Sequence, residues 1–433
     1  MPNPVYRTAT FLAQLVHRLP IGTNLAMAHL LFALLAGHLL SSRGALFPAL
    51  AATGLHAAQV RAAEAALRQG KWDLAQLLTR LAGLIRGEGR AQSHRIEGWQ
   101  PLPIDWVGFF RPRLLGCLTK HYSSQAQKAL PAIEIGMVAT VKHVGARRIP
   151  CLLATTRSGD TAELLAAAKQ KQGHQDVLVA DRQVKISHLH QAGIKQFVVR
   201  AAINLTARRS QPRPAEPGKR GRKPTRGAMV RPLPRTFKGK MLPGTEPDGI
   251  ETFRQEGRSL TALRFDALVV PGCPLVFSCL VVYDPKYKQP WVLLTDLAAA
   301  PAKTIYLLYH ARWQIERLPQ TGKQLLGGHR AFVHAEAARY RLPELCLLAA
   351  SLSLYLAATS AAVATGFWDR HPQPTPGRFR RALSGAPVPP FEEFAALCPR
   401  VRKKASVHAH LVKGVAAHRR QSRRATAPLL TEK

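Results

Sequence analysis

Four polar residues of different chemistry recur at helical spacing in one stretch of the sequence. They are Tyr309, Arg312, Glu316 and Lys323. At about 100° per residue, a helix would place all four within an arc of about 60° on one face. The opposite side of the stretch is apolar, so the pattern predicts an amphipathic helix with a packed apolar side and a polar stripe that faces away. A solvated stripe with an ordinary Arg–Glu pair is the other interpretation.

Two further acids lie in or at the end of predicted strands. Asp105 lies within a strand predicted at residues 102–110, and Asp181 ends a strand predicted at residues 176–181. Open α/β sheets bind ligands beyond the carboxyl ends of their strands. Together with Glu316, these acids would form the oxygen-ligand set that two Mg²⁺ ions, about 3.5 to 4 Å apart, require for phosphoryl transfer. Three crowded carboxylates would otherwise repel one another and take up protons.

Alternating strands and helices are predicted around these acids. The strands are expected at residues 102–110, 131–144, 148–156, 176–181 and 196–201, and the helices at residues 161–171 and 184–191. Three strands in a meander, then helix, strand, helix, strand and a later long helix, predict an α/β fold with a mixed sheet flanked by helices.

Asp160 is expected to cap the helix at residues 161–171, and Asp296 is expected to cap the later long helix. Trp291 and Trp313 are interpreted as packing residues.

The spacing Y-x2-R-x3-E-x6-K of the four polar residues resembles the signature of the DDE transposases of insertion-sequence family four. The resemblance covers residues 102–326. It implies a ribonuclease-H-like catalytic core, interrupted by a strand-rich insertion, in which the strands of Asp105 and Asp181 are neighbours. Pro319 lies inside the signature and is expected to kink its helix, because proline lacks the backbone N–H that a helix needs.

The same resemblance implies roles for individual residues. The catalytic and metal-binding acids would be Asp105, Asp181 and Glu316, with two Mg²⁺ ions or Mn²⁺ as a substitute. The residues that hold DNA backbone phosphates would be Tyr309, Arg312 and Lys323. The implied activity is metal-dependent strand cleavage at the ends of an insertion sequence and strand transfer into target DNA, by a homodimer on paired ends.

The composition independently indicates a polyanionic partner. The 433 residues include 62 Lys and Arg against 25 Asp and Glu, a net charge of +37. Such an excess points to nucleic acid, and the resemblance implies that it is double-stranded DNA. The hydrophobic content of 46% supports a folded core rather than a basic tail. The six dispersed cysteines lack zinc-ligand spacing, which favours a reduced cytoplasmic protein. The resemblance implies that this cytoplasm is bacterial and that the protein is associated with the nucleoid.

The chain is expected to divide into five segments. They are a helical DNA-binding domain at 1–100, the first part of the catalytic core at 101–202, a basic arm with a strand-rich insertion at 203–297, the second part of the core at 298–370 and a basic tail at 371–433. Within the first segment, residues 46–67 fit either a helix-turn-helix that reads DNA or a plain helical hairpin.

The arm at residues 208–240 is too basic and proline-rich to build a core, so an extended or disordered segment is expected. Its candidate DNA-binding residues are Arg220, Arg222 and Lys223. They fit either a minor-groove hook or a linker that binds phosphates.

Residues 345–365 form an uncharged run, which is interpreted as a buried core helix and not as a membrane span.

The net charge fits a function other than that of an active transposase equally well. A catalytically decayed transposase that acts only as a DNA-binding protein would keep the same basic segments.

Overall fold

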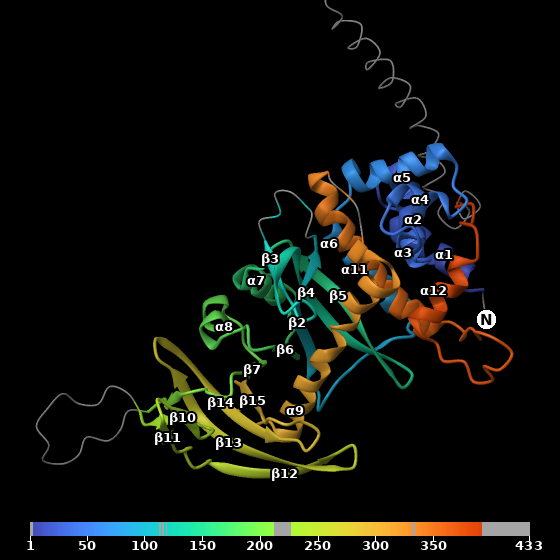
Figure 1. Ribbon diagram of the computed structural model, residues 1–433. Helices are drawn as coiled ribbons and strands as arrows, with labels where there is room; N and C mark the ends of the chain where they lie inside the picture. Colours follow the sequence, from blue (N-terminus) through green and yellow to red (C-terminus); the bar gives the residue numbers. More distant parts are fainter. Residues whose placement is uncertain are drawn as a thin grey trace, which may run out of the picture. The chain divides into compact units, whose positions relative to one another are not determined.

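The computed structural model describes residues 3–111, 114, 117, 119–211, 227–330, 333 and 335–391. Contacts divide the chain into two compact units, shown in Figure 1. The helical unit combines Met1–Glu88 with Gln320–Lys433, and the sheet unit is Gly89–Pro319. The segment predicted at 298–370 is therefore divided between the two units at residue 319.

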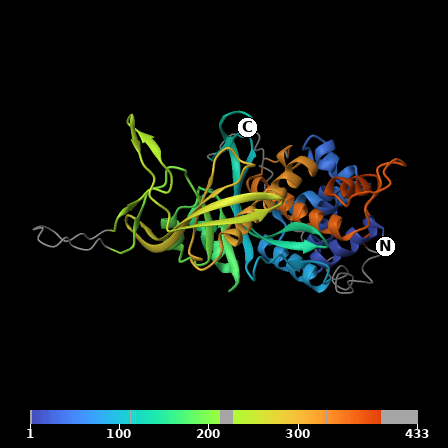
Figure 2. The same cartoon turned by 90° about the horizontal axis from the view of Figure 1, so that it is seen from below.

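The helical unit is built from two distant parts of the sequence. Its N-terminal helices (blue) and its later helices (orange to red) lie side by side in Figures 1 and 2. The α-helices are α1 (Pro4–Val16), α2 (Thr23–Leu35), α3 (His38–Ser41), α4 (Leu46–Ala51), α5 (Ala57–Gln69), α6 (Leu74–Gly87), α11 (Glu336–Thr359) and α12 (Pro376–Ser384). The predicted helical N-terminal region is thus confirmed. The stretch at residues 46–67 forms α4 and most of α5, of which α5 buries Val60, Ala63, Ala66 and Leu67.

Helix α11 passes through the core of the helical unit. Its 24 residues are long and apolar enough to cross a membrane, but 94% of its most apolar window is buried inside the protein. Core helices of soluble proteins have this burial. The predicted buried helix is confirmed, although it begins earlier, at Glu336, and ends earlier, at Thr359.

The sheet unit contains one large mixed sheet and a separate small hairpin. The strands of the large sheet are β1 (Gln92–Ser93), β2 (Gln100–Phe110), β3 (Lys120–Ser123), β4 (Lys128–Val144), β5 (Arg147–Thr156), β6 (Asp176–Ala180), β7 (Phe197–Ala201), β8 (Ala207–Arg209), β9 (Met229–Val230), β12 (Gly249–Gln255), β13 (Arg258–Val270), β14 (Cys273–Tyr283) and β15 (Trp291–Thr295). The hairpin consists of β10 (Arg235–Phe237) and β11 (Lys240–Leu242).

The centre of the sheet has the order β5-β4-β2-β6-β7. β2, β6 and β7 run parallel to one another, and β4 runs antiparallel to both β2 and β5. Helix α7 (Thr161–Lys171) connects β5 to β6, and helix α8 (Ile186–Ala192) connects β6 to β7. The predicted α/β architecture is confirmed, with each of these elements within a few residues of its predicted position.

The strand-rich insertion continues the central sheet. β15 pairs with β7, and β14 and β13 follow in antiparallel order. The prediction for the arm at residues 208–240 is wrong at both ends, because β8 and β9 join the sheet there and β10 pairs with β11. Residues 212–226, with Arg220, Arg222 and Lys223, lie outside the described residues.

The two faces of the sheet bury different partners. On one face, α7 and α8 pack against Leu102, Leu178 and Phe197. On the other face, helix α9 (Ala302–His310) packs against Val177, Val179 and Val198. Successive strand residues alternate between the faces, so the α9 face receives residues 177, 179 and, by continuation, 181.

Candidate active site

Asp105 and Asp181 lie at the same level of neighbouring parallel strands. β2 and β6 pair with Pro103 opposite Val179. Two residues further along each strand, the chain reaches Asp105 and Asp181, on the face that α9 covers. β6 ends at Ala180, so Asp181 stands directly beyond its carboxyl end. The predicted adjacency of these two strands is confirmed.

The signature stretch is an irregular helical segment and not one regular helix. It comprises α9, a 3₁₀ turn at Ala311–Gln314, the short α10 (Arg317–Gln320) and a π-helical turn at Thr321–Leu325. Pro319 has no N–H for the carbonyl four residues earlier. The N–H groups of Ile315 and Leu318 bond instead to carbonyls three residues back, each at 3.0 Å. The predicted single long helix is therefore wrong, and Pro319 lies inside the short α10.

Tyr309 and Arg312 of the polar stripe face the sheet instead of facing away, whereas the Glu316 side chain is 53% exposed. Tyr309 is 1% exposed and Arg312 is 6% exposed. This corrects the expected outward orientation, which treated the stripe as the solvent side of the helix. A buried guanidinium requires charged or polar partners, and the strand acids supply them.

Arg312 joins the acids of the strands to the acid of the helical segment. Its Nη1 donates to Asp105 Oδ2 at 3.3 Å, and its Nη2 donates to Glu316 Oε1 at 2.8 Å. The Tyr309 hydroxyl donates to Asp181 Oδ1 at 3.4 Å. The guanidinium carbon lies 5.8 Å from the centre of the Tyr309 ring. The structure therefore brings together five of the predicted site residues.

The surroundings of Asp105 raise the pKa of its carboxyl group. Burial raises the pKa of its carboxyl group to about 6, and Glu316 and Asp181 add to the rise, while Arg312 and the Trp106 N–H oppose it. Burial by itself lowers the pKa of the Arg312 guanidinium, but its neighbours, these acids among them, outweigh burial and raise that pKa. Burial also raises the pKa of the Tyr309 phenol. The Arg312 guanidinium thus faces several acids in a partly desolvated site.

Arg200 is a site residue that the sequence reasoning missed. β6 and β7 pair with Ala180 opposite Val199, which places Arg200 beside Asp181 in the same row. Its positive charge opposes the burial that raises the pKa of the Tyr309 phenol. A lone arginine in the otherwise apolar strand FVVRA is the signal that could have identified it, since a charged residue at a strand interior needs a partner.

An aromatic cluster fixes the start of the helical segment on the sheet. The Trp291 ring stacks on Tyr306 with centroids 5.3 Å apart, and it meets Tyr309 and Trp313 edge to face at 5.1 and 5.8 Å. The Tyr306 hydroxyl donates to buried Asp284 at 2.7 Å. These contacts confirm packing roles for Trp291 and Trp313.

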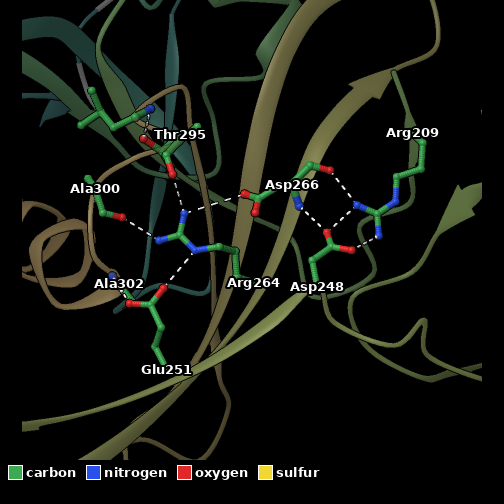
Figure 3. Close-up of polar contacts among 10 residues, drawn as sticks. Arg209, Asp248, Glu251, Arg264, Asp266, Thr295, Ala300 and Ala302 are labelled. Carbon is green, nitrogen blue, oxygen red and sulfur yellow. Dashed lines mark hydrogen bonds and ion pairs between the residues drawn. The ribbon is translucent and has the colours of Figure 1, made fainter. Parts of the chain in front are cut away.

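A polar brace from the insertion holds the first residue of α9 (Figure 3). Glu251 of β12 accepts a hydrogen bond from the Ala302 N–H at 2.8 Å, and its other oxygen accepts one from Arg264 Nε at 3.0 Å. Arg264 also donates to the carbonyls of Ala298 and Ala300, at 2.9 and 2.6 Å. The Glu251 carboxylate, which is distant in sequence, therefore gives the first N–H of α9 a hydrogen-bond partner. It also places a negative charge at the positive end of the helix dipole.

Replacing Glu251 with Ala is expected to lower the free energy of unfolding by about 1 to 2 kcal/mol, the usual cost of a lost helix cap. Urea denaturation followed by circular dichroism measures this change. Glu256→Ala is the matched control, because Glu256 is 53% exposed at its side chain and pairs only with Arg258 among the described residues. An equal loss in both variants would contradict the brace.

Three other predictions concern Lys323, Asp296 and Asp160. Lys323 lies in the π-helical turn, which belongs to the helical unit. Asp296 was predicted to cap α9, and this is wrong, because its carboxylate accepts hydrogen bonds from the N–H groups of Gln196 and Phe197. Asp160 caps α7 as predicted, through the Ala162 N–H at 2.9 Å.

The carboxylates of Asp105, Asp181 and Glu316 are chemically suitable ligands for a hard divalent cation. Carboxylate oxygens are the ligands that Mg²⁺ prefers, and a bound cation would oppose the rise that burial causes in the pKa of Asp105. In the described part of the chain, however, no group of three His, Cys, Asp or Glu side chains is close enough to hold a metal ion. The guanidinium of Arg312 contacts both Asp105 and Glu316 in this arrangement.

Comparison of the sequence with known protein families finds no match, and comparison with curated proteins finds none either.

Proposed function

We propose that this chain is a DNA transposase of the DDE class, with a ribonuclease-H-like core. The observation that carries the proposal is the placement of Asp105 and Asp181 side by side on parallel strands, beneath the segment that supplies Glu316. The central order β5-β4-β2-β6-β7 supports it, because it is a three-strand meander followed by two parallel strands reached through helices. The net charge of +37 supports a DNA substrate.

The residues of the site suit two different tasks. Asp105, Asp181 and Glu316 would hold two Mg²⁺ ions, which supply an activated water and charge stabilisation for phosphodiester cleavage when bound. Arg312, Arg200 and Tyr309 present N–H and O–H donors in the same row and would orient a backbone phosphate. Arg312 Nε is buried without an acceptor in the described part of the chain, as expected of a donor whose partner is a ligand. The freed 3′-hydroxyl of the cut strand would then attack a target phosphodiester.

A second function is favoured by one observation. The Arg312 guanidinium forms salt bridges with two of the three acids, Asp105 and Glu316, and so offsets part of their negative charge. A decayed transposase that only binds DNA would keep such a cluster as a structural ion-pair network. DNA affinity cannot separate the two functions, because both depend on the same basic surface.

Strand cleavage separates the two functions. Wild-type protein with Mg²⁺ or Mn²⁺ is expected to nick DNA that carries the sequences flanking this gene, at a defined position. Glu316→Gln is expected to bind this DNA equally well and to lose cleavage by at least about a hundredfold, because one oxygen ligand is lost. Glu163→Gln, a change at an exposed position of α7, is the control and should cut normally. Failure of the folded wild-type protein to cut would favour the DNA-binding function.

A further inference from the structure

Two adjacent aromatic side chains project from the segment between α11 and α12 in the helical unit. Phe367 is 94% exposed and Trp368 is 67% exposed. Their rings meet edge to face, with centroids 5.2 Å apart and planes at 79°. Single exposed apolar residues are common, but two neighbouring large rings turned to solvent mark a binding surface.

The segment holds these rings in a defined place. The Asp369 carboxylate accepts hydrogen bonds from the N–H and hydroxyl of Thr365, at 3.1 and 3.2 Å, and pairs with Arg378 of α12 at 2.8 Å. The Trp368 ring lies directly over Gly366, where an added Cβ would come within 2.4 Å of the ring. The aromatic pair is therefore presented by a braced turn.

The surroundings of the pair are cationic. Between residues 360 and 385, the chain has four arginines, Arg370, Arg378, Arg380 and Arg381, and one acid, Asp369. Arg380 turns away to the Leu325 carbonyl, and Asp369 is paired with Arg378, so the positive charge next to the rings comes from exposed Arg370, two residues after Trp368. Exposed aromatic faces next to arginines are the combination that binds single-stranded nucleic acid, by base stacking and phosphate attraction.

We propose that Phe367 and Trp368 form a stacking site for unpaired bases of single-stranded DNA. This site belongs to the helical unit and does not use the carboxylate cluster, so it stands whether the chain cuts DNA or only binds it. Paired bases in a duplex cover their faces with their neighbours, so a duplex offers no equivalent ligand.

The test uses the full-length protein and a labelled oligothymidylate of about 12 nucleotides, a length within the usual site size. Fluorescence anisotropy is measured at raised salt, where phosphate contacts contribute less. The double variant Phe367→Ala/Trp368→Ala is expected to bind at least about fivefold more weakly, since stacking contributes about 1 kcal/mol or more per base. Trp368→Phe keeps an aromatic face and should retain most of the affinity.

Two further variants test whether the position of the Trp368 ring matters and whether any exposed ring would serve. Gly366→Ala leaves both rings but displaces Trp368, and it is expected to weaken binding as well. Tyr122→Ala removes another exposed ring, 58% exposed and near lysines, and should change nothing. Equal affinity of the wild type and the double variant would overturn the proposal. So would a self-association, seen by sedimentation, that the double variant abolishes without a change in oligonucleotide affinity, because a second copy would then be the occupant.

Discussion

Replacing Arg312 with Met is expected to lower the free energy of unfolding at pH 7 by about 2 to 4 kcal/mol. The side chain of Arg312 is 7% exposed and pairs with Asp105 and Glu316. Removing one partner of a buried ion pair typically costs about 3 to 5 kcal/mol, because the other charge remains desolvated. The partial exposure of the two acids, 27% and 53%, reduces this cost. Urea denaturation at fixed ionic strength measures the change.

Two comparison variants identify the cause of that loss. Arg182→Met removes an exposed arginine next to Asp181 and is expected to change stability by less than about 0.5 kcal/mol. In the double variant Arg312→Met/Asp105→Asn, much of the lost stability should return, because the uncompensated charge is gone. If Arg312→Met were as stable as the wild type, the guanidinium would not be compensating the acids.

Replacing Asp105 with Asn is expected to raise the free energy of unfolding at pH 7.5 by about 1 to 3 kcal/mol while abolishing cleavage. The pKa of Asp105 is raised from 3.8 to about 6, mainly by burial, so the folded state holds its proton more tightly than the unfolded state. One pKa unit corresponds to about 1.4 kcal/mol, and the partly exposed side chain screens some of this. The neutral amide avoids burying a charge, but it removes a ligand that phosphoryl transfer requires.

The raised pKa of Asp105 also predicts how the difference in stability between the wild type and Asp105→Asn changes with pH. Below pH 3.8 the carboxyl is protonated in both states and contributes no difference. As the pH rises towards about 6, the unfolded state loses its proton first, so the wild type loses stability relative to Asp105→Asn. The difference should then stay constant above about pH 7. Parallel stability curves for the two proteins between pH 4 and 7 would contradict the raised pKa.

The sequence contained enough information to predict the central sheet. Apolar runs bounded by turn residues located β2, β6 and β7 within a few residues, because buried parallel strands require continuous apolar sequence. Asp105 and Asp181 stood out as acids in or directly after such runs. The adjacency of their strands was predicted from the resemblance to a ribonuclease-H-like core, and the pairing of β2 with β6 confirms it.

The orientation of the polar stripe could not be derived in the same way. Helical periodicity shows which residues share a face, but not whether that face meets solvent or a row of acids. Tyr309 and Arg312 are buried because partners from β2 and β6 satisfy them. Asp296 was misassigned for a related reason, since its partners on β7 are about a hundred residues earlier in the chain. Local sequence carries no record of such distant contacts.

Binding of Mn²⁺ to the carboxylates tests the central claim of this account most directly. Electron paramagnetic resonance can count the ions bound to wild-type protein in the presence of DNA, and the account predicts two per chain. Asp181→Asn should lose this binding and Glu163→Gln should keep it. The affinity should rise as the pH passes the Asp105 pKa of about 6, because the proton competes with the metal. A wild-type protein that binds no Mn²⁺, or an Asp181→Asn variant that binds as much, would contradict a metal-dependent phosphoryl-transfer site.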